Sequence, residues 1–312
     1  MLRKNNLPLL LIIAFLVCKC SGGPTANEPT DTATSGEVKI IVDESFQPIF
    51  KEQIYTFESI YPNAKINATY TSEGDALTKL MNDSCKVVVL SRDLTLKERK
   101  SFESNNLFPI STKIGEDAIA VIVNNENPDS ALTMTNIRDI LLANDSVWSQ
   151  ISLSSYDQHI SVVFDSKGSA NARYMKDSVL NGKEFAKNVF TENSTLEVID
   201  YVRKTKGALG FISVNWISDQ DDPKVLEILK SVKLMAVSKT TPELAVKPFQ
   251  AYIQTKEYPF TRGVYMINRQ TRAGLGMGFV SFVAGEKGQL MFLKSGLIPG
   301  FPPERMIKIK ED

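Results

Sequence analysis

The stretch "HISVVFDSKGSANARY", residues 159–174, places small polar residues directly after an apolar run and before the start of a helical pattern. Gly168 and Ser169 lie in this junction, with the cations Lys167 and Arg173 on either side of them. A helix begins with unpaired backbone N–H groups and a partial positive charge, which together attract anions. We therefore predict a strand, an anion-binding junction and a helix over this stretch.

Similar strand and helix patterns extend over the rest of the chain. "EVKIIVD", "AKINATY" and "CKVVVLS" have strand patterns, and the amphipathic stretches "FQPIFKEQIYTFESIYP" and "DALTKLMND" lie between them. This β-α-β-α-β order, over residues 37 to about 105, predicts an α/β fold. Further on, "FQAYIQTKEYPFTRGVYMINRQ" has a strand-like pattern, and "GMGFVSFVAGEKGQLMFLKSG" predicts one closing helix.

The composition argues against several classes of function. With 312 residues the chain is long enough for two lobes. Its formal net charge is zero, which gives no indication of a nucleic-acid partner. One histidine, His159, and three cysteines cannot supply a metal site rich in His or Cys. A phosphatase would need metal ligands or a nucleophile activated by a base. We therefore predict a protein without a cofactor, a metal or an enzymatic activity.

The N-terminus has the pattern of a bacterial lipoprotein signal. Two basic residues precede an apolar run of eleven residues, Leu7 to Val17, which is too short to span a bilayer as a stable helix. The following "VCKCSGG" resembles a lipobox, so we predict a signal peptide over residues 1–19 and lipidation of Cys20. Cys18 is the alternative, because Lys19 replaces the small residue that usually precedes the cleavage point.

Residues 20–36 contain no large apolar side chain and are rich in Gly, Pro, Ser and Thr. Such a segment cannot bury a core, so we predict a flexible tether between a lipid anchor and a folded body. The protein would then lie in the cell envelope, facing the periplasm or the cell surface, with its anchor in the inner or the outer membrane. An ordinary signal peptide with incidental cysteines is the other interpretation. Cys85 is expected to be a small core residue.

Three further junctions follow strand patterns. They contain Ser45, Ser72, and the triplet Ser91, Arg92 and Asp93. Ser or Asp at a single junction is most often an N-cap that bonds the first turn of a helix. The ligands of open α/β sheets, however, lie at the carboxyl ends of the strands. The recurrence of such residues at several strand ends therefore favours one shared anion site.

The same stretches carry a resemblance to a known family. From Glu37 to Pro299 the chain resembles the high-affinity phosphate-binding proteins of bacterial ABC importers. "DESFQPIFKEQIYTFESIYP" is similar to their first motif, a Ser or Thr followed by Phe and a nearby Pro, and "LSRDLTLKE" is similar to their Ser-Arg motif. "FDSKGSANARY" takes the place of their Gly-Ser-Gly-Thr loop. "YPFTRGVYMI" and "FVSFVAGEKGQLMFLKSGLIP" match their C-terminal signatures.

The resemblance implies a two-lobed periplasmic-binding-protein fold of type II with two hinge crossings. Lobe 1 would hold residues 37–115 and 239–312, and lobe 2 would hold residues 116–238. The protein would capture inorganic phosphate between the lobes and deliver it to the permease subunits of an ABC importer, acting as a monomer. The alternatives are the same fold with another oxyanion or a small anionic metabolite, or a surface lipoprotein that senses or scaffolds.

The ligand-binding residues that we predict on this basis are Ser45, Phe46, Ser72, Ser91, Arg92, Asp93, Lys167, Gly168, Ser169 and Arg173. Two departures from the family bear on them. The family often has an arginine at the strand end before the fourth loop, where this chain has about Val163, so Lys167 or Arg173 must supply the charge. Glu73 in the second motif would repel an anion if its side chain faced inward.

The proton of phosphate offers a basis for selectivity. Phosphate near neutral pH still holds a proton that a carboxylate can accept, whereas sulfate has none. A site with such an acceptor rejects sulfate, because the buried carboxylate would stay unpaired. Asp93 is the first candidate for the acceptor because it lies beside Ser91 and Arg92, and Asp43 and Asp165 are the alternatives.

Overall fold

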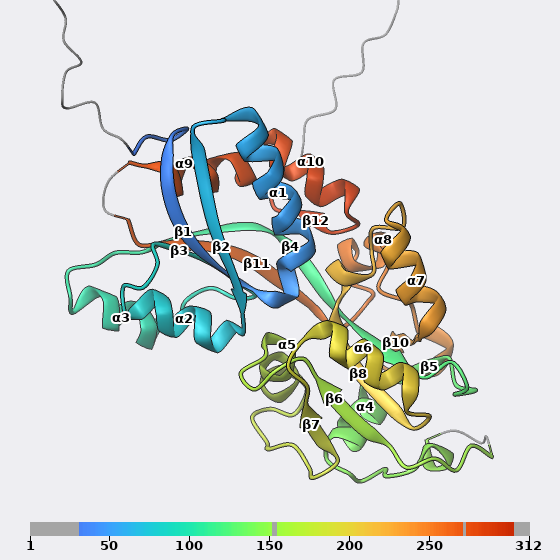
Figure 1. Cartoon of the computed structure of the whole chain (residues 1–312). Coiled ribbons are helices and arrows are strands. Elements are labelled where there is room, and N and C mark those ends of the chain that lie inside the picture. Colours follow the sequence, from blue (N-terminus) through green and yellow to red (C-terminus); the bar gives the residue numbers. More distant parts are fainter. Residues whose placement is uncertain (1–30, 152–154, 271–272, 303–312) are drawn as a thin grey trace, which may run out of the picture. The chain divides into compact units, whose positions relative to one another are not determined.

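The computed structural model describes residues 31–151, 155–270 and 273–302. Within these ranges strands and helices alternate along most of the chain (Figure 1), and the predicted α/β class is confirmed. The predicted signal peptide, residues 1–19, and both candidate lipidation residues, Cys18 and Cys20, lie outside the described residues.

The strands of the main sheet are hydrogen-bonded in the order β2-β1-β3-β11-β4-β8-β6-β7. Their bounds are β1 (Gly36–Asp43), β2 (Ala64–Thr71), β3 (Val87–Leu90), β4 (Ile110–Val123), β6 (Ser161–Phe164), β7 (Val189–Thr191), β8 (Ala208–Ser213) and β11 (Thr261–Asn268). Two short strands, β9 (Lys233–Leu234) and β12 (Ile298–Pro299), also pair with β4. Strands β5 (Ala131–Thr133) and β10 (Ala236–Ser238) form a separate parallel pair.

Strand β4 joins two groups of strands. Its first part, Ile110 to Ala118, pairs antiparallel with β11, and its last part, Ile119 to Val123, pairs antiparallel with β8. Strands β1, β2 and β3 are parallel to one another, and so are β6, β7 and β8. The polar junctions singled out in the sequence therefore follow the carboxyl ends of parallel strands in both groups.

Several helices begin at a side chain that caps the first turn. Their bounds are α1 (Gln47–Ile60), α2 (Glu73–Met81), α3 (Leu96–Glu103), α4 (Met134–Leu141), α5 (Ala170–Tyr174), α6 (Thr195–Lys204), α7 (Pro223–Ser231), α8 (Gln250–Gln254), α9 (Leu275–Ala284) and α10 (Glu286–Lys294). At the N-cap of α2, Ser72 accepts a hydrogen bond from the backbone N–H of Asp75. Before α3, Thr95 and Glu98 form a capping box.

Strand β1 is buried on both faces, as its continuous apolar pattern predicts. Val38, Ile40 and Val42 belong to a core cluster with side chains of α1, α9 and α10, whereas Ile41 packs with side chains of α2 and α3 on the opposite face. Full burial of one such side chain contributes about 1.5–3 kcal/mol. Two helical layers therefore fix the carboxyl end of β1, where Asp43 lies.

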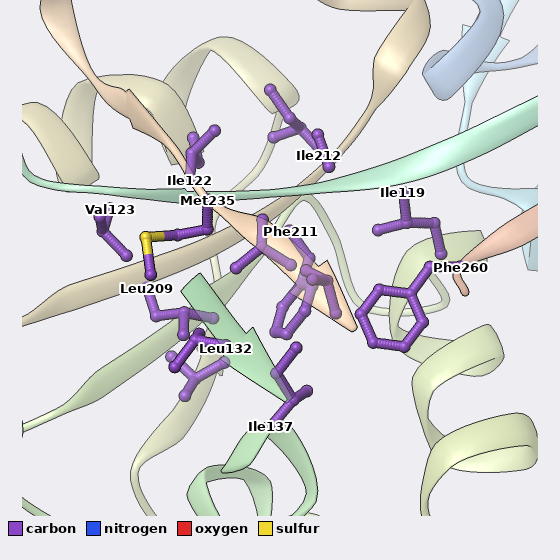
Figure 2. Close-up of a cluster of buried hydrophobic side chains, with 14 of the residues drawn as sticks. Ile119, Ile122, Val123, Leu132, Ile137, Leu209, Phe211, Ile212, Met235 and Phe260 are labelled. Atoms are coloured by element: carbon purple, nitrogen blue, oxygen red, sulfur yellow. The ribbon is translucent and has the colours of Figure 1, made fainter. Parts of the chain in front are cut away.

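A separate core cluster surrounds β8 and the last part of β4. Figure 2 shows Ile122 of β4 and Phe211 of β8 with Leu132 of β5 and Ile137 of α4, all of them fully buried. Phe164, the last residue of β6, stacks on Phe211 with the ring centroids 4.9 Å apart. This packing fixes the start of the junction between β6 and α5.

Two expectations for the C-terminal part of the chain are wrong. The stretch before β11, which has a strand-like pattern, contains helix α8. This helix begins at Gln250, whose side chain donates hydrogen bonds to the backbone carbonyls of Leu293 and Leu297. The predicted closing helix is interrupted at Gly285, so α9 and α10 are separate helices. After the break, α10 packs closely against the end of α9. Glycine is needed at position 288, because a Cβ there would lie only 2.4 Å from a backbone oxygen of α9.

The last residues of the predicted tether are packed against helix α9. We name residues 31–35 the N-terminal strap. Asp31 accepts a hydrogen bond from the backbone N–H of Leu275 at 2.7 Å, at the start of α9. A Cβ on Gly278 would lie 1.9 Å from a carbonyl oxygen of the strap, so only glycine permits this approach. The predicted flexible segment, residues 20–36, therefore has to end before the strap.

Replacing Gly278 by alanine should force the strap away from α9. We expect the free energy of unfolding to fall by about 1–3 kcal/mol, the usual effect of overpacking, as measured by urea denaturation of a chain that begins at Asp31. In a chain that begins at Gly36 the same substitution should have a much smaller effect, because the clashing carbonyl is absent. An equal loss in both chains would contradict the contact between the strap and α9.

Candidate anion-binding site

Buried charged residues gather near the ends of the two groups of strands. We call them the strand-end cluster, which consists of Asp43, Glu73, Asp117, Asp165 and Arg262. All five are 6% exposed or less, and Arg262 interacts electrostatically with Asp117, Asp43 and Glu73. Asp43 ends β1 and Asp165 directly follows β6, while Asp117 and Arg262 lie on β4 and β11. Because a buried charge is unfavourable unless it is paired, such a concentration indicates a functional site.

Arg262 is held by a buried carboxylate on the neighbouring strand. Arg262 and Asp117 are directly opposite each other in the antiparallel pair of β11 and β4. Nε of Arg262 donates to Oδ2 of Asp117 at 2.9 Å, and the hydroxyl of Ser213 donates to the same oxygen at 2.9 Å. The guanidinium lies 5.4 Å from the centre of the Phe46 ring. Burial acts to lower the pKa of Arg262, but Asp117 and Asp43 raise it above its ordinary value, so the side chain stays charged.

Several buried polar atoms close to this pair have no hydrogen-bond partner among the described residues. They include Nη1 of Arg262, Oδ2 of Asp43, Oγ of Ser45, Oδ1 of Asn171 and Oδ1 of Asn215. The amide N–H groups of Asn171 and Asn215 donate to Asp165 and to the backbone carbonyl of Ser45, which places both amides at the cluster. A buried polar group left unpaired costs about 1–3 kcal/mol. A set that contains both donors and acceptors therefore indicates a polar ligand.

Burial raises the pKa values of three carboxyl groups of the cluster, Asp43, Asp117 and Asp165, and for Asp117 it does so against the pairing with Arg262. Burial raises the pKa of Asp43 to about 8, and Glu73 adds to the effect while Arg262 opposes it. Burial also raises the pKa of Asp165, against the hydrogen bond that it accepts from Ser169. At neutral pH Asp43 is therefore largely protonated, and the cluster holds less negative charge than its composition suggests.

Glu73 faces inward, and its carboxylate binds residues that were predicted to bind the anion. Ser91 donates to Oε2 of Glu73 through its backbone N–H at 3.0 Å and through its hydroxyl at 2.5 Å. Nε of Arg173 donates to Oε1 at 2.5 Å. Burial acts to raise the pKa of Glu73, but Arg173 and Ser91 together hold it below its ordinary value. An internal carboxylate thus occupies donors that the sequence assigns to a ligand.

The junctions before α2 and α5 lie against each other. The backbone N–H of Gly74 donates to the carbonyl of Gly168 at 3.3 Å. Gly168 has a φ of 93°, which favours glycine. Ser72 and Ser169 are the N-caps of α2 and α5, and Ser169 also donates to Asp165. The capping interpretation therefore accounts for both serines, although Ser169 remains in contact with the cluster.

Arg92 and Asp93 make their main contacts at the start of α3. Arg92 donates to both carboxylate oxygens of Glu98 at 2.8 Å, and its Nε lies 3.5 Å from Oε1 of Glu73. Asp93 pairs with Arg99 at 2.6 Å, and its side chain is 42% exposed. Asp93, the first candidate for the proton acceptor, is therefore directed away from the cluster. Asp43, one of the two alternatives, has an unpartnered oxygen at the cluster and can accept the proton of the ligand when it is ionised.

A polar cavity of about 510 Å³ lies beside the cluster. Lys167 and Ser72 line it, together with Glu44 and Ser166, which directly follow cluster residues in the sequence. Lys167 and Gly168 are exposed, so this lysine contributes its charge at the surface. Burial raises the pKa of Glu44 to about 7, against hydrogen bonds from Thr195 at the start of α6.

Arg262 is a candidate site residue that sequence reasoning missed. Val163, at the position where the family often has an arginine, is fully buried and uncharged. Arg262 supplies a buried guanidinium from β11 instead. The only local signal was one charged residue in the strand pattern "FTRGVYMI", and a charge in such a pattern normally faces solvent. Ser45 and Phe46, two of the residues predicted from the sequence, are fully buried beside the cluster.

Within the described ranges no group of three or more His, Cys, Asp or Glu side chains could hold a metal ion. In the same part of the chain, no helix has both the length and the apolar character needed to cross a membrane.

Comparison with known proteins places this chain in a family. A family model described as "PBP superfamily domain" matches residues 27–287. The chain is 22% identical over 323 residues to the phosphate-binding protein PstS of Bacillus subtilis, covering 100% of this chain and 98% of the relative. It is 23% identical over 261 residues to the protein of the same name from Borreliella burgdorferi, covering 80% of this chain and 85% of the relative.

A solved structure with the same fold comes from Clostridium perfringens. It is described as a putative phosphate ABC transporter substrate-binding protein with bound phosphate. The TM-score is 0.72 at 22% identity, and the match covers 85% of this chain and 99% of that chain. The likeness confirms the predicted two-lobed periplasmic-binding-protein fold of type II. Because the family model covers most of its length, this chain belongs to the PBP superfamily.

Proposed function

We propose that this protein captures inorganic phosphate at the strand-end cluster and delivers it to the permease subunits of an ABC importer. The observation that carries the proposal is the set of unpartnered buried donors and acceptors around Arg262. The relatives from Bacillus subtilis and Borreliella burgdorferi are named phosphate-binding proteins, and the Clostridium perfringens structure contains bound phosphate. Membership of this superfamily supports solute binding rather than catalysis.

Phosphate can supply both the acceptors and the donors that the unpartnered atoms at the cluster require. Nη1 of Arg262 and the hydroxyl of Ser45 are donors that suit the bare phosphate oxygens. Oδ1 of Asn171 and Oδ1 of Asn215 are acceptors that suit P–OH groups, and the free oxygen of Asp43 joins them once Asp43 is ionised. Sulfate has no acid proton near neutral pH and would leave these acceptors unpaired, so the cluster should select phosphate over sulfate.

The number of contacts is sufficient for useful affinity. Hydrogen bonds to a charged group contribute about 1.5–3 kcal/mol each. A micromolar dissociation constant requires about 8 kcal/mol. Five or so such bonds can provide that amount after the costs of ordering and desolvation are subtracted. The buried position of the donors supports this estimate, because water competes little for them.

The proposal includes the organisation expected from the sequence. Residues 37–115 and 239–312 would form lobe 1 and residues 116–238 lobe 2, with closure around phosphate as a hinge motion. Strand β4, which pairs with β11 and then with β8, would run through the first crossing. Lipidated Cys20 would hold the monomeric protein in the cell envelope, outside the cytoplasm.

A second candidate is the same fold with another oxyanion or a small anionic metabolite as ligand. Two observations favour it. Val163 stands where the family often has an arginine, and Glu73 binds Ser91 and Arg173, which were expected to contact phosphate. The cavity of about 510 Å³ also leaves room beside the cluster for a larger ligand.

A thermal melt distinguishes the two candidates. The chain beginning at Asp31 is partly unfolded and dialysed to remove carried-over ligand, then melted with phosphate, sulfate or molybdate. Phosphate at 100 times its dissociation constant should add about 2.7 kcal/mol, which raises the melting temperature by about 5 °C. Sulfate and molybdate should have no effect. A shift with sulfate or molybdate but not with phosphate would contradict the proposed function and favour another oxyanion.

Ser45→Ala should weaken phosphate binding by about tenfold, because it removes one donor worth about 1.4 kcal/mol. Stability should change little, since the Ser45 hydroxyl has no partner within the described protein. Thr95→Ala is the control, because it removes the N-cap of α3 and should cost about 1 kcal/mol of stability without loss of affinity. Titration calorimetry and urea denaturation measure both quantities. Unchanged affinity in the Ser45 variant would argue against this position for the ligand.

Asp43→Asn should change how stability depends on pH. The pKa of Asp43 is raised from 3.8 to about 8 in the folded protein, so the folded state holds its proton more strongly than the unfolded state. Its contribution to stability is fully present below pH 3.8 and is lost as pH rises towards 8. Relative to the variant, wild-type stability should therefore fall across this range, by up to about 1.4 kcal/mol per pH unit. Parallel curves for the two proteins would show that Asp43 is not protonated at neutral pH.

A further inference from the structure

The guanidinium groups at the strand-end cluster are neutralised by carboxylates of the protein itself. Nη2 of Arg262 lies 2.8 Å from Oδ2 of Asp117, and Nε of Arg173 lies 2.5 Å from Oε1 of Glu73. The nearby Arg92 pairs with Glu98. A bound anion therefore meets guanidinium charges that are already balanced.

Glu73 controls how much positive charge this region offers to a ligand. Its carboxylate binds Arg173, whose Nη2 also donates to the hydroxyl of Ser91 at 2.9 Å. Because Glu73 is 2% exposed, solvent screens its charge little. The same charge acts on Asp43 and on Arg262. Without the carboxylate of Glu73, Arg173 would keep only its longer contact with the exposed Asp177, at 3.5 Å, and most of its charge would be available to an anion.

The unpartnered atoms of the cluster set a second condition on the ligand. Four of the unpartnered atoms in or beside the cluster are acceptors when both aspartates are ionised, namely Oδ2 of Asp43, Oδ1 of Asp117, Oδ1 of Asn171 and Oδ1 of Asn215. When Asp43 is protonated, the two amide oxygens still require donors. The ligand must therefore bring hydrogen-bond donors of its own, and a phosphate that keeps its acid protons does so.

We propose that Glu73 is a specificity-determining residue that restricts the site to singly charged, proton-bearing phosphate and excludes doubly charged anions without an acid proton. It does this by neutralising Arg173 and by placing a buried negative charge next to the ligand. This inference rests on the proposed function. The charged and titratable groups that face Glu73 are Arg173, Arg92, Asp43 and Arg262, and Asp43 in turn faces Asp165.

Monofluorophosphate is the probe for this restriction, because its charge and its lack of an acid proton distinguish it from inorganic phosphate. At pH 6 it is largely doubly charged and has no acid proton, whereas most inorganic phosphate is singly charged. Titration calorimetry at pH 6 on the full-length protein in detergent, stripped of ligand, gives the ratio of the two affinities. The wild type should bind phosphate at least about a hundredfold more tightly than monofluorophosphate, which corresponds to about 2.7 kcal/mol.

Glu73→Gln should reduce this ratio by about tenfold or more, mainly by improving the binding of monofluorophosphate. The matched control is Glu184→Gln, which removes a carboxylate from an exposed ion pair with Lys176 and should keep the wild-type ratio. The same ratio in the wild type and in Glu73→Gln would overturn the inference. If the Glu73 variant fails to fold, the wild type alone decides, because equal affinity for the two anions would also overturn it. Absence of any phosphate binding by the wild type would instead refute the proposed function on which the inference rests.

Discussion

The buried ion pair between Arg262 and Asp117 is the interaction on which the site depends. The two residues lie opposite each other on neighbouring antiparallel strands, so the backbone pairing of β11 and β4 sets their distance. A guanidinium that is removed from water needs a carboxylate partner to offset the cost of its burial. Asp117 provides that partner, and Nη1 of Arg262 still has no acceptor among the described residues. The sheet thus holds one donor in place before any ligand binds, which lowers the entropy lost on binding.

The second feature of the site is the buried carboxylate of Glu73. In a chain of this family a carboxylate close to an anion is expected to be unfavourable, and here it is stabilised by Arg173 and by both donors of Ser91. The contact joins the junction before α2 to helix α5. Loss of Glu73 would leave a partly buried arginine without its partner, so the carboxylate supports the local structure and the electrostatics together.

The sequence was sufficient to predict the elements that depend on local pattern. The strand and helix before and after Ser45, and the positions of Ser45 and Phe46, follow from periodicity and junction residues. Arg262 could not be found in this way, because its burial depends on pairing with a strand about 145 residues away in sequence. The same dependence on packing explains why the sequence favoured Asp93 over Asp43 as the proton acceptor. Asp43 ends a strand and Asp93 lies just after one, and only the packing of α3 and Arg99 shows that Asp93 is directed elsewhere.

The most direct test is a crystal structure of the protein, stripped of carried-over ligand and then soaked with phosphate. Phosphate should lie within hydrogen-bond distance of Nη1 of Arg262 and the hydroxyl of Ser45, with Glu73 still paired to Arg173. Phosphate bound to Ser91 and Arg173, with the side chain of Glu73 displaced, would contradict the assignment of the anion to the strand-end cluster.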